Sequence, residues 1–165
     1  MTIQIPHNGL ETDNNSKQKT ITYTGTTPII QVKSNNIAPN NDPDSSAIIE
    51  NLIINGTNTP GVTGILLDDV YNCFIRNITI MNCETGIKVQ NTTGNFSRTN
   101  RFEHIRMINV KTGIHFTGTN ISNKDFANTT IDNMGISLKN QEPTAVGIKI
   151  GPNANLNRTF IKANI

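Results

Sequence analysis

The sequence predicts an all-β solenoid, a fold in which successive turns of one chain stack as parallel strands. The first observation is a short phrase of Thr or Val, then Gly and Ile, which occurs four times with glycines 22, 27 and 34 residues apart. Such spacing is typical of repeat proteins. The second is a β-rich run ending in Asn ahead of the phrase. The third is the composition, since 35% hydrophobic and 5% aromatic residues without tryptophan suit the narrow core of a solenoid.

Each copy of the phrase is expected to form a strand. An apolar residue, a variable residue and a second apolar residue follow the glycine, which is the period of a strand with one buried face. A helix would need apolar residues three or four positions apart. We expect the glycines to mark either a sharp corner that needs a positive φ or a close approach of the backbone to the next coil. The four glycines are Gly64, Gly86, Gly113 and Gly147.

The β-rich runs predict the register between coils. Residues 75–90 align on residues 102–117 without a gap, at an offset of 27 residues. Parallel strands in such a register bring each residue about 4.8 Å from its counterpart. The predicted stacked pairs include Ile78 with Ile105, Ile80 with Met107, Gly86 with Gly113 and Val89 with Phe116.

The same register predicts a ladder of asparagines. Asn55, Asn82 and Asn109 fall in one column, and Asn133 and Asn164 are expected to extend it. Stacked carboxamides can donate and accept hydrogen bonds along the solenoid axis, and Asn tolerates the left-handed backbone of a tight corner. The alternative is that asparagine is simply common in this chain.

Charged residues support this register. Glu50, Arg76 and Glu103 fall in one outward column, and Glu84 faces Lys111 in another. Opposite charges in neighbouring strands contribute up to about 1 kcal/mol each. We interpret them as a solvated face of the scaffold.

The run CFIRNITIMNCETGIKV at residues 73–89 resembles a coil of the right-handed parallel β-helix proteins of the pectin-lyase-like superfamily. The resemblance covers residues 21–165. It implies an N-terminal arm or cap at residues 1–19 and a right-handed, single-stranded parallel β-helix at residues 20–165, with about five to six coils. We expect the helix to continue beyond the chain end. The superfamily includes pectate lyases, polygalacturonases, phage tailspikes and surface proteins without a known reaction, so the resemblance does not select an activity.

Asp68 and Asp69 are the weak candidates for catalysis. Glycoside cleavage uses two carboxyl groups on either side of the scissile bond. The stacked counterparts of Asp68 are Gln90, Thr117 and Gly151, so no second acid aligns with it. The Gly-His-Gly and Arg-Ile-Lys signatures of the resembling enzymes are absent as well. We therefore favour a loop-capping role for the pair.

The remaining polar residues predict no metal or cofactor site. Calcium would be expected only in a lyase, and Asp42, Asp44, Asp68 and Asp69 lack the spacing of a calcium loop. His104 shares a column with Asn77, and His115 has Lys88 stacked on it. Cys73 and Cys83 bracket one strand, which would hold them about 30 Å apart as free thiols.

Charge and hydropathy exclude two classes of function. The net charge is +2 without a basic run, so we expect no nucleic-acid binding, and no apolar run is long enough for membrane insertion. The first seven residues do not resemble a secretion signal.

We expect a noncatalytic β-helix module of an extracellular surface or virion protein, similar to a tail fibre or spike. Its expected partners are polysaccharides or glycoproteins, and homo-oligomers are expected through an open sheet edge. The alternative is part of a polysaccharide lyase or glycoside hydrolase, whose active residues would lie partly in other coils.

Overall fold

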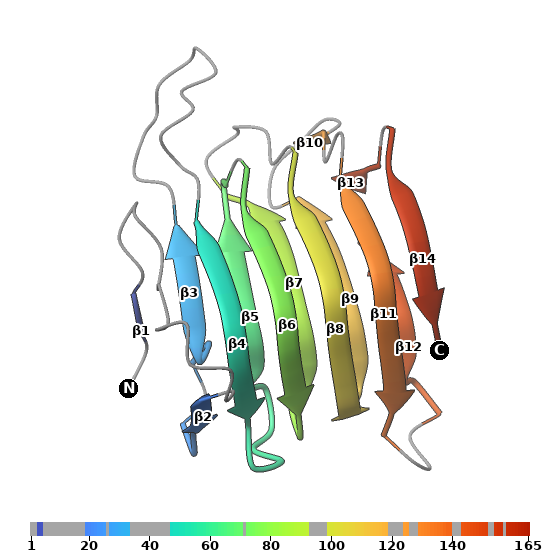
Figure 1. Cartoon of the computed structure of the whole chain (residues 1–165). Coiled ribbons are helices and arrows are strands. Elements are labelled where there is room, and N and C mark those ends of the chain that lie inside the picture. The colour runs from blue at the N-terminus through green and yellow to red at the C-terminus, as the bar shows by residue number, and fades with distance from the viewer. Residues whose placement is uncertain are drawn as a thin grey trace.

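The computed structural model shows two parallel β-sheets that face each other across one core (Figure 1). The structure describes residues 3–4, 19–25, 27–33, 47–70, 72–92, 99–118, 124–125, 129–139, 143–151, 154–156 and 158–165. Every regular element in these ranges is a β-strand, as predicted. The described residues include no helix with the length and apolar character needed to cross a membrane.

The chain alternates between the two sheets, which we name A and B. Sheet A has the order β1-β3-β5-β7-β9-β12, sheet B has the order β2-β4-β6-β8-β11-β14, and β10 pairs with β13 in a small third sheet. All pairings are parallel. A strand of sheet B and the next strand of sheet A form one coil. The strand bounds are β1 (Ile3–Gln4), β2 (Lys19–Thr22), β3 (Ile30–Lys33), β4 (Ile48–Asn55), β5 (Thr63–Asp68), β6 (Phe74–Met81), β7 (Thr85–Asn91), β8 (Arg101–Val110), β9 (Thr112–Gly118), β10 (Lys124–Asp125), β11 (Thr130–Leu138), β12 (Val146–Ile150), β13 (Ala154–Asn155) and β14 (Phe160–Asn164).

The predicted register is confirmed in both sheets. Ile78 pairs with Ile105 and Ile80 with Met107 between β6 and β8. Val89 pairs with Phe116 between β7 and β9. The segment predicted as an arm also contributes to the sheets, because β1 pairs with β3 and β2 begins at Lys19.

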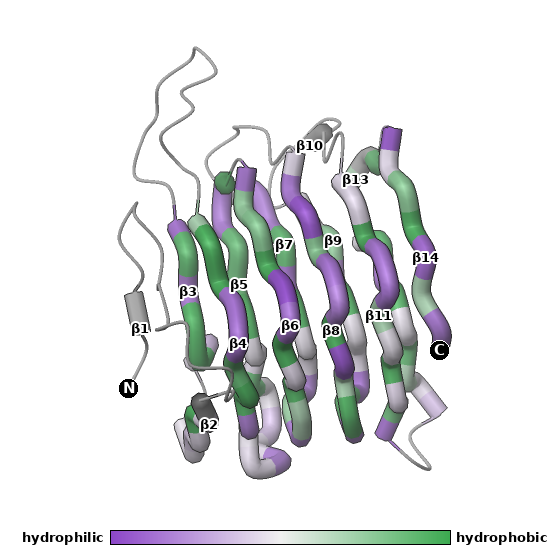
Figure 2. The backbone as a smooth tube through the Cα atoms, in the orientation of Figure 1, coloured by the Kyte–Doolittle hydropathy of each residue, from purple (hydrophilic) through white to green (hydrophobic). Residues whose placement is uncertain are grey.

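The core consists of stacked apolar side chains between the sheets. Hydrophobic and polar residues alternate along the strands (Figure 2), and the buried hydrophobic residues form the core. Phe102 and Phe116, the largest of them, are fully buried. Burial of such a side chain contributes roughly 1.5 to 3 kcal/mol. Because no strand in the described ranges supplies more than four buried hydrophobic side chains, the core stays narrow and its stability depends on the stacking of neighbouring coils.

The four phrase glycines lie within strands and permit a close approach of the backbone. A methyl group built on Gly64 would lie 2.7 Å from the carbonyl oxygen of Gly86, and one on Gly86 would lie 2.8 Å from that of Gly113. Gly113 is crowded in the same way by the carbonyl oxygen of Gly147, whereas Gly147 itself lies against the side chain of Ile165. None of the four has a positive φ, and Gly61 is the only described glycine that has one. The positive-φ alternative is therefore wrong, and the close approach of the backbone describes Gly64, Gly86 and Gly113.

Left-handed backbone occurs instead at polar residues. Asn82 and Asn109 of the predicted ladder have φ angles of 56° and 55°, and a second set forms a column inside the sheet B strands. Asn51, Asn77, His104 and Asn133 have φ angles of 57°, 51°, 52° and 51°. Asn77 Nδ2 donates to Asn51 Oδ1 at 2.6 Å. Asn and His adopt this conformation more readily than most residues, so each strand bends sharply at this point without a glycine.

The ladder of asparagines lies at the carboxyl ends of the sheet B strands β4, β6 and β8. Asn82 Nδ2 donates to Asn55 Oδ1 at 2.9 Å, and Asn109 Nδ2 donates to Asn82 Oδ1 at 2.8 Å. The two expected extensions were wrong. Asn133 follows Asp132, the partner of Glu103, and so stands beside His104, while Asn164 pairs with Gly135. The register of β11 is irregular between Ser137, the partner of Ile108, and Leu138, the partner of Val110. No residue of β11 therefore stands opposite Asn109, and the ladder does not continue into this strand.

We predict that Gly64→Ala destabilises the fold. The added methyl group would meet the Gly86 carbonyl oxygen at 2.7 Å and Ile80 Cγ2 at 2.8 Å, neither of which can move freely. Overpacking of this kind costs about 1 to 3 kcal/mol. Urea unfolding followed by circular dichroism measures the change.

The matched control is Gly135→Ala, also in a sheet strand. A methyl group there has no atom within 4 Å, so its stability should equal or slightly exceed that of the wild type. Equal free energies of unfolding for the two variants would contradict the close-approach role of Gly64.

Candidate functional site

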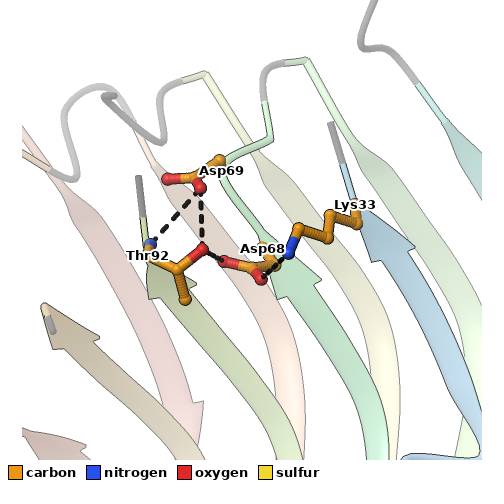
Figure 3. A network of polar contacts seen from close by, with 4 residues as sticks. All are labelled: Lys33, Asp68, Asp69 and Thr92. Carbon is orange, nitrogen blue, oxygen red and sulfur yellow. Dashed lines mark hydrogen bonds and ion pairs between the residues drawn. The ribbon is translucent and has the colours of Figure 1, made fainter. Parts of the chain in front are cut away.

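The two candidate acids lie at the carboxyl end of β5. Asp68 is the last residue of the strand, and Asp69 follows it with a φ of 54°. The left-handed turn at Asp69 brings its carboxyl group back toward the neighbouring strands (Figure 3). Asp68 is only 2% exposed and Asp69 only 1%. Buried carboxylates need partners, because water no longer solvates them.

Thr92 and Lys33 supply partners for the pair. Thr92 Oγ1 lies 2.9 Å from Asp68 Oδ1 and 3.0 Å from Asp69 Oδ2, and the Thr92 amide donates to Asp69 Oδ2 at 3.3 Å. Lys33 Nζ lies 3.5 Å from Asp68 Oδ2. The hydroxyl has a single hydrogen, so it donates to one carboxyl group at a time. The network joins the ends of β3, β5 and β7 (Figure 3).

This geometry suits a structural network better than glycoside cleavage. The cleaved bond would have to lie between the two carboxyl groups, and the Thr92 hydroxyl occupies that position (Figure 3). Gln90 and then Thr117 stack on Asp68 as the register predicts, so the neighbouring coils add no acid. In this arrangement the pair holds the turn after β5 against the end of β7.

Sequence reasoning did not identify Lys33 or Thr92 as partners of the acids. A signal for Lys33 was present, because Ile29–Val32 resembles the repeated phrase and one further step places Lys33 opposite Asp68. Thr92 follows the end of β7 at Asn91, outside the repeated phrase. Its contacts depend on the turn at Asp69, which the periodicity does not define.

The other candidates do not join this network. His104 lies in the left-handed column of sheet B, beside Asn77 as predicted. Asp42 and Asp44 are outside the described residues. In the described part of the chain, no three His, Cys, Asp or Glu side chains come close enough to hold a metal ion.

The two cysteines are buried thiols that form no disulfide. Burial raises the pKa of each thiol, Cys73 and Cys83, to about 12. Since the thiolate is the nucleophilic form, both thiols are poor nucleophiles near neutral pH.

Three charged residues on the outer face of sheet B alternate in sign, and the next residue of their column is a second acid, Asp132, opposite Glu103. Glu50, Arg76 and Glu103 are stacked in this order, and Arg76 pairs with Glu50. Lys111 Nζ lies 3.2 Å from Glu84 Oε1. Both predicted charge pairings are therefore confirmed. Opposite charges on neighbouring strands stabilise the correct register, and a shifted register would lose these contacts.

The outer face of sheet A carries a stack of basic side chains one column away from the Lys33–Asp68 ion pair. Lys88, His115 and Lys149 are stacked in register on β7, β9 and β12, and we call them the cationic column. Burial, with the neighbouring charges of Lys149 and Lys88, lowers the pKa of His115. The imidazole is therefore largely uncharged at neutral pH.

We predict that Thr92→Val destabilises the protein by about 1 to 3 kcal/mol, because two buried carboxyl groups lose a shared hydrogen-bond donor. The control is Thr92→Ser, which keeps the hydroxyl and should retain most of the stability. Thermal unfolding measures both variants. A serine variant as unstable as the valine variant would show that the methyl group, and not the hydroxyl, matters at this position.

In comparisons with known proteins, no family model, curated protein or solved structure matches this chain.

Proposed function

We propose that this chain is a noncatalytic β-solenoid module of a surface or virion appendage, similar to a tail fibre or spike, that contacts glycans. We further propose that the solenoid is a right-handed parallel β-helix of about five to six coils, related to the pectin-lyase-like superfamily. The strict alternation of strands between two parallel sheets supports this assignment. So does the recurrent left-handed bend in the sheet B strands.

The observation that carries the proposal is the use of Asp68 and Asp69 within the scaffold. Both are buried, and Thr92 bridges them. A polysaccharide cannot reach buried acids without opening the ends of three neighbouring strands. The pair therefore supports stability of the coils, and the outer faces remain for recognition.

The outer faces suit a long polymeric partner. Their polar side chains repeat from coil to coil about every 4.8 Å along the solenoid axis. The columns offer carboxamides, hydroxyls and charges, which are the groups that hydrogen-bond sugars. Recognition of this kind requires neither a cofactor nor a metal ion.

Exposed apolar residues in the last two coil strands support self-association as a further part of the proposal. Ile150 of β12 is 56% exposed, and Phe160 of β14 is also 56% exposed. β12 and β14 are the edge strands of their sheets, so the backbone groups on one side of each are available for pairing. Edges of this kind recruit further strands, and a second copy of the chain could supply them.

The test is incubation of the protein with a panel of neutral and acidic polysaccharides. We expect retention on some of them in affinity electrophoresis and no increase in reducing ends or unsaturated sugar products. Asp68→Asn is measured beside the wild type, with circular dichroism to verify folding. Depolymerisation by the wild type that a folded Asp68→Asn variant lacks would favour the lyase or hydrolase alternative.

A further inference from the structure

We propose that the cationic column binds a linear polysaccharide that carries sulfate esters and lies along the solenoid axis. The inference rests on the proposed glycan-contacting role and assigns it a face and a chemical class of ligand. The column belongs to the outer face of sheet A, across three adjacent strands.

The column lacks local charge compensation, which is the first argument for a binding role. Within the described ranges, no carboxylate forms an ion pair with Lys88 or Lys149. On sheet B, by contrast, Arg76 pairs with Glu50, and Lys162 Nζ lies 4.0 Å from Asp132 Oδ1. Stacked cations without such a partner attract a ligand of opposite charge.

The geometry fits a polymer that crosses the strands. Neighbouring members of the column are separated by one coil, about 4.8 Å, which is close to the length of one sugar unit. Neutral hydrogen-bonding columns flank the cations on both sides. They contain Thr85 with Thr112 on one side and Gln90 with Thr117 on the other, all of them partly exposed. These groups can bind sugar hydroxyls while the cations bind the esters.

His115 lies between the two lysines and makes the column sensitive to pH. A methyl group on Gly151 would lie 3.2 Å from His115 Nε2, so the absence of a side chain there leaves room for the imidazole. Lys88 from β7 and Lys149 from β12 flank it, and no described acid faces it. At neutral pH the column has two charges, and acidification adds the third. A bound anion favours the protonated imidazole.

The donor set favours sulfate esters over carboxylates and nucleic acid. An ammonium group is a compact charge with three donors, which suits a tetrahedral oxyanion. The planar fork of Arg suits bidentate binding of carboxylates and phosphates. Here Arg76 and Arg101 pair with Glu50 and Glu103 on the other sheet. The three columns contain no Phe, Tyr or Trp on which bases could stack.

The experiment measures affinity for dextran sulfate, polygalacturonate, unmodified dextran and single-stranded DNA as a function of salt. The double variant Lys88→Gln/Lys149→Gln is compared with Arg106→Gln/Lys162→Gln, which removes the same charge from sheet B. We expect the first to weaken dextran sulfate binding by about tenfold or more and to reduce the salt slope by about two, and the second to leave both unchanged. The first should be about as stable as the wild type, because neither lysine forms an ion pair within the described ranges.

The pH arm uses His115→Gln. Affinity of the wild type for dextran sulfate should rise between about pH 7.5 and about pH 5.5, and the variant should lose this rise. Equal weakening by both double variants would overturn the inference, as would equal or tighter binding of polygalacturonate or DNA, or no binding of dextran sulfate. If the Lys88→Gln/Lys149→Gln variant still binds another glycan as the wild type does, the cationic column is not the binding site. That result would overturn this inference and leave the proposed glycan-contacting role in place. Depolymerisation of a bound polymer would instead contradict the noncatalytic role.

Discussion

In-register stacking of parallel coils is the constraint on which the other features depend. It brings each residue close to the equivalent residue of the next coil. A residue type that packs poorly against its own kind would therefore be unfavourable in every coil. At the phrase glycines the backbones approach so closely that a methyl group would meet the next carbonyl oxygen. At Asn55, Asn82 and Asn109 the same stacking produces a continuous ladder of hydrogen bonds. Glycine and asparagine thus act together to hold the coils in one register.

The stacking also decides which polar groups remain free for recognition. It joins Lys33, Asp68 and Thr92 from three consecutive strands of sheet A, and it buries the acids. One column away, it brings Lys88, His115 and Lys149 together on the surface. The two acids considered as catalytic candidates are therefore buried, with Thr92 between them. The residues with unbalanced charge lie where a polymer could contact them.

Much of the fold could be predicted from the sequence, because the alignment of one repeat on the next gives the register between their strands. The alignment of residues 75–90 on residues 102–117 identified partners in both sheets, including Ile80 with Met107. Two local features could not be predicted this way. The glycines and asparagines both suit a corner, and only the backbone angles show which residues are left-handed. They are Asn51, Asn77 and His104 inside the strands, and Asn82 and Asn109 in the ladder. Asn133 was assigned to the wrong column because the asparagine spacing does not reveal the offset between β8 and β11, which pairs Phe102 with Ile131. For the candidate site, Thr92 lies outside the repeat and was missed.

The most direct test of the in-register account is disulfide formation between introduced cysteines. Thr79 and Arg106 are partners on the outer face of sheet B, whereas the partner of Ile108 is Met81. Partners stand about 4.8 Å apart, within the span of a disulfide, and a shift of two residues exceeds it. The native thiols have a pKa of about 12 and should not compete. Mild oxidation followed by mass spectrometry should link Thr79→Cys with Arg106→Cys and leave Thr79→Cys with Ile108→Cys open. Efficient linkage of the second pair and not the first would contradict the register.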